Sequence, residues 1–498
     1  MRLSCPEVHL DCLPISEVSL NLDCRDEIIP ILRALQYVYA DPLLRRQLLA
    51  LVGKDVNGDT NRKLGRRGMN YWEIAVLAGT RLGCDLDYDK LQDLAENHRR
   101  LRQIMGIGDW QEAVDLDWRR IEDNLIKLRS ETLKKINDLL VRAGHVLVPE
   151  AIKAVRGDTF LVETNIHYPT ESALIGDGLR KIVQVATDLA TAAHVSGWRQ
   201  GRHSLKKVRG LVRKIGQAAR AKGAGANRLQ PDYKKLLTLA AHLLQRARAL
   251  LQTLGFAPDP AAFTLDKVKS GTALITTAEA KLLHYVILTE KVCDNAQRRV
   301  LHDEAVANEE KIHSIFEPHT ELIKRGKQPN PIQFGHMVLV IEDAAGFVID
   351  YQVVPNGVLD QDLVVPVMKQ LQKWFSGRIQ SASFDRAFHT PANQKDLADI
   401  VKHPCIAAKG QEQGRSQHTK GTVAFRKARQ NHPGVESAIG ALQSGNGLKR
   451  CRDRSKRGYE RYVALGILGR NLQTLGKLLL AQDKADCQAA KSKRKRAA

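Results

Sequence analysis

The pattern of apolar and polar positions predicts helices along the first part of the chain. Apolar side chains recur at helical spacing from about residue 26 onward. Asp41 followed by Pro42 favours a helix start, and Gly53 is a residue that can end that helix. The short helices and glycine-containing turns fit either a plain bundle or a helix-turn-helix. We therefore predict an all-α N-terminal domain over residues 1–150, with DNA binding as its expected role.

Strand patterns lie on both sides of a long helical stretch. A run rich in β-branched and apolar residues begins at Asp158 and ends at Ile166, and the pattern is then helical until about residue 325. Two further runs separated by a turn at 344–346 predict a β hairpin. After the hairpin, helix and strand patterns alternate: helix 364–375, strand 379–384, helix 391–400 and strand 405–408. Residues 435–480 are then mostly helical, with a break near 445–447.

The order of these elements predicts the fold class. Without the long helical stretch, the order is three strands, a helix, a strand, a helix, a strand and a helix, as in ribonuclease H-like folds. We therefore predict an α/β protein, in which a ribonuclease H-like core carries a large helical insert and follows an all-α N-terminal domain. The predicted bounds are 151–180 and 326–480 for the core, 181–325 for the insertion and 481–498 for a basic tail.

The charge of the sequence points to a polyanionic partner. Net charge is +22, from 77 Lys and Arg against 55 Asp and Glu. Residues 198–248 hold 14 Lys and Arg and one acidic residue, Asp232, and residues 401–498 hold 22 Lys and Arg against 6 Asp and Glu. Cations that neutralise phosphates release counterions, so such surfaces favour nucleic acid. We expect DNA, because the strand-borne aromatic side chains that recognise RNA are not evident.

Other features narrow the class of protein. The eight cysteines include no Cys-x-x-Cys pair, which argues against a zinc ribbon and favours a reducing compartment. No apolar run approaches the roughly 20 residues of a membrane span, and the first residues do not resemble a signal peptide. We expect a soluble intracellular protein without a membrane partner. The Lys- and Arg-rich run 491–496 predicts a disordered tail that contacts phosphates.

Three carboxylates are the candidate catalytic residues. In the predicted topology the first strand lies at the sheet centre beside the fourth, so Asp158 and Asp385 can approach each other, and Glu436 begins a helix that crosses both. Glu163 lies an odd number of residues from Asp158 and should face the opposite side of the sheet. Neighbouring carboxylates repel unless a cation is bound, and hard oxygen ligands favour Mg²⁺ or Mn²⁺. Two such ions can serve an in-line phosphoryl transfer.

Ordinary structural roles compete with this hypothesis. Asp158 can be a strand-edge residue, Asp385 a helix cap, and Glu436 a first-turn acid that suits the helix dipole. Three histidines lie near the same segments, either as core and loop residues or as groups that orient a phosphate or water: His167, His336 and His389.

The segments around the three carboxylates resemble the corresponding blocks of ISNCY-type bacterial insertion-sequence transposases. The first-Asp block is similar over Thr164–Ser172 after Asp158, the second-Asp block over Ser383–Asn393, and the Glu block over His432–Leu442. The similarity extends from about residue 64 to residue 476. One departure is that better-studied relatives carry a Tyr-Arg-Glu-Lys type signature around the Glu. Here His432 stands four residues before Glu436 and Gln443 seven after it.

The resemblance implies a DDE transposase that cleaves transposon ends and joins them to target DNA. Asp158, Asp385 and Glu436 would be its catalytic triad and the ligands of two Mg²⁺ or Mn²⁺ ions. The partners it implies are double-stranded DNA, as inverted repeats and as target, and further copies of the chain in an oligomeric synapse. It also implies a bacterial cytoplasmic protein associated with the nucleoid. Two alternatives remain: a nuclease on the same fold, and a repurposed transposase that only binds DNA.

Overall fold

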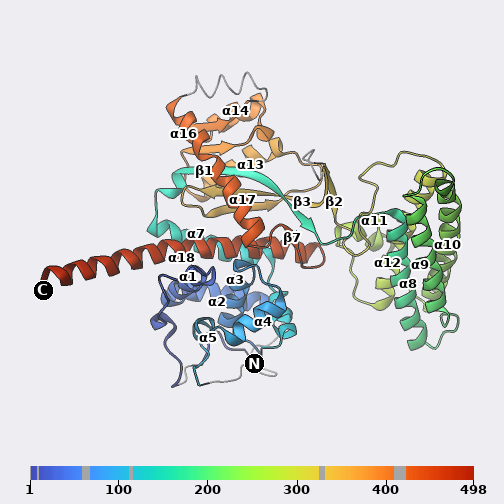
Figure 1. Cartoon of the computed structure of the whole chain (residues 1–498), viewed down its shortest axis with the longest axis horizontal. Coiled ribbons are helices and arrows are strands. Elements are labelled where there is room, and N and C mark those ends of the chain that lie inside the picture. Colours follow the sequence, from blue (N-terminus) through green and yellow to red (C-terminus); the bar gives the residue numbers. More distant parts are fainter. Residues whose placement is uncertain are drawn as a thin grey trace. The chain divides into compact units, whose positions relative to one another are not determined.

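The computed structural model describes residues 2–7, 10–58, 68–110, 116–324, 331–408 and 422–497. The described chain forms two compact units (Figure 1). Unit 1 comprises Met1–Glu163, His336–Asp453 and Arg457–Ala498, and unit 2 comprises Thr164–Gly335 and Arg454–Lys456. Residues 326–330 and 409–421, which the sequence assigns to the core, lie outside the described residues.

Unit 1 begins with α-helices, as the apolar spacing predicts. They are α1 (Ile28–Ala40), α2 (Pro42–Asn57), α3 (Tyr71–Gly83), α4 (Tyr88–Asn97), α5 (Arg99–Met105), α6 (Trp118–Leu125) and α7 (Ser130–Leu147). The Asp41 carboxylate accepts hydrogen bonds from the backbone N–H groups of Leu43 and Leu44, at 2.8 and 3.0 Å, so the predicted start of α2 is confirmed.

The predicted end of α2 at Gly53 is wrong, because the helix continues to Asn57. A Cβ atom at Gly53 would lie only 2.8 Å from the ring of Tyr71 at the start of α3. The glycine therefore allows two helices to approach closely, a role that local sequence does not distinguish from helix ending.

The sheet places β1 (Ala154–Thr164) at its centre. On one side lies β3 (Ile332–Asp343), with β4 (Val348–Val353) antiparallel to it, which confirms the predicted hairpin. On the other side lie β5 (Ser381–Phe384) and then β6 (His403–Ile406), each parallel to its neighbour. A two-residue strand, β7 (Arg450–Cys451), also pairs with β1. The fold is thus α/β with a mixed sheet.

The predicted start of β1 at Asp158 is wrong. The strand begins four residues earlier, where Ala154 pairs with Ser381 of β5. Asp158 therefore lies inside the strand. The sequence predicts too late a start for β1 because Arg156 and Gly157 are individually poor strand signals. In the structure, pairing with β5 holds both residues in the strand.

Helices accompany the sheet: α13 (Asp360–Trp374), α14 (Pro391–Ala398), α16 (Val423–Asn431), α17 (Pro433–Gly445) and α18 (Lys456–Ala497). In Figure 1, α18 runs between the N-terminal helices and the sheet. Close contacts support this position: a Cβ at Gly469 of α18 would lie 2.5 Å from the Gly83 backbone, and Asn471 of α18 bonds to Val348 of β4. One hydrophobic cluster therefore spans both parts, which the sequence assigned to separate domains.

The end of the chain differs from the disordered tail that the sequence predicts. Residues 481–497 continue α18 as helix. Their composition explains this, because Ala, Lys, Gln and Arg are strong helix formers and the segment contains neither Gly nor Pro.

Unit 2 is a helical bundle with its own hydrophobic cluster. Its helices are α8 (Glu171–Ala192), α9 (Gly201–Ala218), α10 (Leu229–Thr253), α11 (Leu265–Ser270) and α12 (Ala278–Ala296), and the four long ones lie side by side in Figure 1. A short strand that the sequence did not indicate, β2 (Glu321–Lys324), pairs antiparallel with the first residues of β3. The unit begins earlier and ends later than the insertion predicted at 181–325. Among the described residues, no helix has the length and apolar character to cross a membrane.

Candidate active site

Asp158 and Asp385 lie at matching positions along two neighbouring parallel segments, β1 and the end of β5. The pairing of β1 with β5 runs from Ala154 opposite Ser381 to Gly157 opposite Phe384. Asp158, the next residue, is still in β1, and Asp385 directly follows the end of β5. The close packing requires a glycine at 157, because a Cβ there would lie 2.5 Å from side-chain atoms of Ile341 and Phe384. The structure thus brings together the first two predicted site residues.

Glu436 reaches the same region from α17. The helix buries Val435, Ala438 and Leu442 on its inner face and leaves Glu436 exposed. Further along α17, Gln443 donates a hydrogen bond from Nε2 to the Leu161 carbonyl of β1, at 3.3 Å. Gln443 therefore attaches the helix to the central strand.

The charges of Asp385 and Glu436 both act on Asp158. Asp158 is half-buried, and burial is the main reason that its pKa is raised to about 6. The charges of Asp385, Asp360 and Glu436 raise this pKa further, whereas a hydrogen bond from the Thr159 N–H to the Asp158 carboxylate, at 2.7 Å, lowers it. A cation beside Asp158 would offset this repulsion.

Asp360 is a carboxylate of this region that the sequence analysis missed. The Thr159 hydroxyl donates a hydrogen bond to Asp360 Oδ1, at 3.0 Å, directly beside Asp158. The predicted helix began at residue 364, four residues after α13 begins, so Asp360 fell outside it. The available signal was Asp362, whose carboxylate accepts a hydrogen bond from the Leu359 N–H at 3.1 Å and marks the helix start.

Arg156 and His432 connect α17 to the sheet. Arg156 of β1 donates from Nε to Glu342, at 2.7 Å, and from Nη1 to the Asn431 carbonyl, at 3.0 Å. His432 is buried, and its Nδ1 lies 3.1 Å from the Ser383 hydroxyl of β5. Burial, helped by nearby arginines, lowers the pKa of His432 to about 4, so the ring is neutral at pH 7. These residues support the helix that carries Glu436.

The other candidates have structural partners. Glu163 forms an ion pair with Arg450 at 3.0 Å and does not contribute to the environment of Asp158, in keeping with its predicted opposite orientation. His336 is buried and packs on the Tyr459 ring, with centroids 4.9 Å apart. His389 lies 3.3 Å from the Gln394 side chain.

The donor chemistry of the site fits a hard divalent cation, but the site is not a preformed cage. Carboxylate oxygens of Asp158, Asp385 and Glu436 are suitable ligands for Mg²⁺ or Mn²⁺. Within the described ranges, however, no group of three or more His, Cys, Asp and Glu side chains is arranged to hold a metal ion. The charges of Asp385 and Glu436 raise the pKa of Asp158, although the described side chains do not form a metal-binding group.

Basic residues near α17 differ in how they are engaged. Arg450 pairs with Glu163, and Arg452 bonds to Asp85 and to the Tyr462 hydroxyl. Within the part of the chain that the structure describes, Arg426 and Lys427 of α16 and the exposed Lys449 have no ion pair, so they are the cations best placed to meet an external anion.

No protein-family model, curated protein or solved structure matches the chain.

Proposed function

We propose that this protein is a DDE-type DNA transposase with a ribonuclease H-like core, and that Asp158, Asp385 and Glu436 are its catalytic carboxylates. The observation that carries the proposal is the arrangement of these residues. Asp158 and Asp385 directly follow Gly157 and Phe384, which pair with each other between the parallel strands β1 and β5. The charge of Glu436 raises the pKa of Asp158. The sheet order β2-β3-β1-β5-β6, with β4 paired to β3, supports the proposed fold.

The proposed reaction is a phosphoryl transfer at a DNA phosphodiester. For cleavage, a water oxygen bonds to phosphorus and the bond to the 3′ oxygen breaks; for joining, the freed 3′-hydroxyl attacks a target phosphodiester and displaces its 3′ oxygen. Two Mg²⁺ or Mn²⁺ ions would supply activation of the attacking oxygen and stabilisation of the leaving one. Asp158, Asp385 and Glu436 would hold these ions, and Arg156 and His432 would keep α17 against the sheet.

The proposal includes the partners that such a reaction needs. Double-stranded DNA would serve as inverted-repeat ends and as target, and copies of the chain would assemble in a synapse in the bacterial cytoplasm next to the nucleoid. The charge supports an anionic partner, since the chain carries +22.

The test is cleavage and joining of labelled DNA that carries the element's own ends, with Mg²⁺ or Mn²⁺. We expect Asp385→Asn to lower both activities about 100-fold or more, because a lost metal ligand removes several kcal/mol of transition-state stabilisation. Glu163→Gln is the matched control: it alters a carboxylate of the central strand β1 that pairs with Arg450, and it should retain activity.

Each outcome distinguishes between functions. Metal-dependent cutting and joining that is lost only in Asp385→Asn supports the proposal. Cutting without joining indicates a nuclease on the same fold. Binding without chemistry in the wild-type protein indicates a repurposed DNA-binding protein, and equal activity of Asp385→Asn and wild type removes the proposed site.

A further inference from the structure

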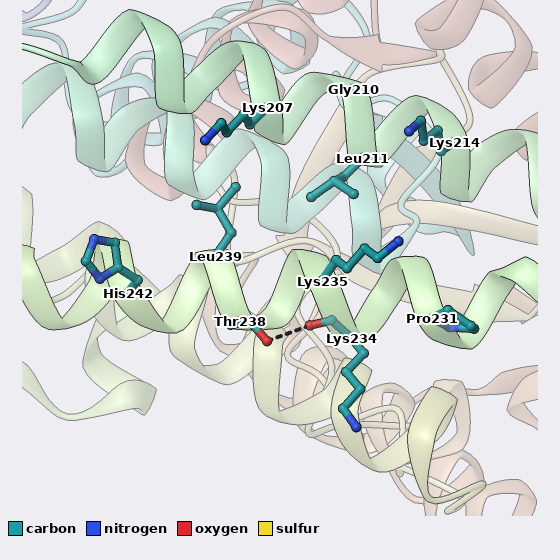
Figure 2. Close-up of a pocket in the computed structure, with 10 residues that line it drawn as sticks. All are labelled: Lys207, Gly210, Leu211, Lys214, Pro231, Lys234, Lys235, Thr238, Leu239 and His242. Carbon is teal, nitrogen blue, oxygen red and sulfur yellow. Dashed lines mark hydrogen bonds between the residues drawn. The ribbon is translucent and has the colours of Figure 1, made fainter.

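Unit 2 carries a groove between α9 and α10 whose polar lining is mainly lysine. The groove measures about 870 Å³ and is lined by Lys207, Gly210, Leu211, Lys214, Pro231, Lys234, Lys235, Thr238, Leu239 and His242. Figure 2 shows Lys207 and Lys214 on one helix and Lys234 and Lys235 on the other, with Leu211 and Leu239 between the helices. None of the described residues that line the groove is acidic.

The cations of α9 lack the partners that cations elsewhere in unit 2 have. On α12 and the turn that follows it, Lys291 and Arg298 both pair with Glu310. Arg248 of α10, away from the groove, pairs with Glu290 at 2.6 Å. The six exposed cations of α9 have no ion pair within the described residues: Arg202, Lys206, Lys207, Arg209, Arg213 and Lys214.

Asp232, the single acidic residue among residues 198–248, does not neutralise the groove. Among the described residues, Asp232 forms an ion pair only with Lys235, at 3.8 Å, and Lys235 is otherwise exposed. Lys207 and Lys214 are seven residues apart, so their Cα atoms are separated by about 10 Å along the helix axis. The positive charge is therefore extended along the helices, as an extended polyanion requires, and is not focused on one point.

We infer that the α9–α10 groove is a phosphate-backbone binding surface for duplex DNA, separate from the carboxylate site. This inference deepens the proposed function, on which it rests for the choice of DNA as the polyanion. Contacts of lysine with phosphates position a duplex without reading its sequence. The groove should therefore bind duplexes of unrelated sequence about equally and release them as salt rises.

The experiment measures binding of the full chain to a labelled duplex of arbitrary sequence across a series of salt concentrations. Two double variants test the groove: Lys207→Gln/Lys214→Gln and Lys234→Gln/Lys235→Gln. Because binding weakens as salt rises, the slope of log K against log salt is negative, and each double variant should reduce its magnitude by up to about two. Binding at 0.1 M salt should weaken at least about tenfold. The matched control is Lys267→Gln/Lys281→Gln, which removes two exposed lysines of α11 and α12 outside the groove and should leave the slope near wild type.

A second pair of variants tests the groove without removing a lysine. A Cβ at Gly210 would meet no atom within 4 Å, so this helical position accepts a side chain. Gly210→Ala should leave DNA binding intact, whereas Gly210→Glu should weaken it by placing a negative charge in the groove. A loss of binding in Gly210→Glu but not in Gly210→Ala shows that replacement of the glycine is not itself the cause.

The outcomes separate this inference from the proposed function. Unchanged salt slopes in both lysine pairs, or an equal loss in the control pair, overturn the groove even if the protein cuts DNA. Reduced slopes support the groove even if Asp385→Asn shows that the chemistry lies elsewhere. Groove variants that lose binding to a polyglutamate peptide but not to duplex DNA would overturn DNA as the occupant.

Discussion

At the residue scale, Asp453 is the clearest case of a buried charge held by two partners. Its carboxylate accepts from Arg81 at 2.6 Å and from Arg461 at 3.0 Å, and all three side chains are nearly inaccessible to solvent. The Tyr88 ring covers the Arg81 guanidinium, with 3.9 Å between the guanidinium carbon and the ring centroid. Burial alone would raise the pKa of Asp453, but the two guanidinium groups lower it overall.

Replacement of Asp453 should therefore destabilise unit 1 strongly. Asp453→Asn leaves two buried guanidinium groups without their counter-charge, and we expect a loss of about 3–5 kcal/mol in the free energy of unfolding. The contribution should be complete above the ordinary carboxyl pKa and be lost as pH falls below it, because the folded-state pKa is the lower one. Denaturant unfolding at pH 7 measures the loss.

A matched aspartate calibrates this prediction. Asp483 pairs with Arg33 at 2.7 Å, but both side chains remain partly exposed. Asp483→Asn should cost less than about 1 kcal/mol. Equal losses in the two variants would contradict the argument that burial makes the Asp453 pair important.

The residues of the candidate site differ in how far the sequence could reveal them. Asp158 and Asp385 could be predicted to meet because strand order places them on adjacent strands. Glu436 depended on the family resemblance, since an acid in a first helical turn is common. Asp360 and Arg156 could not be predicted, because their contacts with Thr159 and with the Asn431 carbonyl join positions far apart in the chain.

At the element scale, the contact between Gly434 and Arg156 positions α17. A Cβ at Gly434 would lie 2.1 Å from Arg156 Nη1, and the hydrogen bonds to Glu342 and Asn431 hold that guanidinium in place. Gly434→Ala must therefore break at least one of these bonds or shift the helix that carries Glu436. We expect DNA cleavage to fall about tenfold or more, measured as single-turnover rate.

Gly440 on the same helix is the control for this substitution. A Cβ there would meet no atom within 4 Å, so Gly440→Ala should keep the cleavage rate and stabilise the helix by up to about 1 kcal/mol. A Gly434→Ala protein with wild-type activity would contradict the role of Arg156 in placing α17.

The elements themselves were largely predictable, and the errors have physical causes. The hairpin β3–β4 and the helices after it follow from local periodicity, which the chain satisfies along those segments. The errors at Gly53 and at the start of β1 arise where a distant partner decides the local structure, Tyr71 in one case and Ser381 in the other. Local patterns do not contain that information.

At the scale of the whole molecule, the described chain has two hydrophobic clusters, one in each unit. The helical insertion could be predicted because the sequence between the first strand and the hairpin has a helical pattern and no strand pattern. It did not indicate that the N-terminal helices share a core with the sheet, because that union depends on backbone contacts such as Gly469 of α18 against Gly83 of α3. Since the clusters share no residue, we expect calorimetry to show separate transitions for the two units.

The transition of unit 2 should respond to pH through His284. This histidine is buried in α12, and burial lowers its pKa to about 4. Its Nδ1 has no hydrogen-bond partner among the residues that the structure describes. Because the unfolded chain binds the proton more tightly, stability is complete above about pH 6.5 and is lost as pH falls toward 4. Between pH 7 and pH 5 the loss should be about 2 kcal/mol.

The variant His284→Phe tests this prediction, because it keeps an aromatic ring and removes the titrating group. We expect it to lower the pH dependence of the unit 2 transition without abolishing it, since burial also lowers the pKa of His313 to about 4 in the same unit. Leu282→Ala identifies that transition, because its side chain is fully buried in the unit 2 cluster and its truncation should cost about 2–5 kcal/mol. If wild type and His284→Phe lose equal stability between pH 7 and pH 5, the proton is taken up elsewhere and the assignment to His284 is wrong.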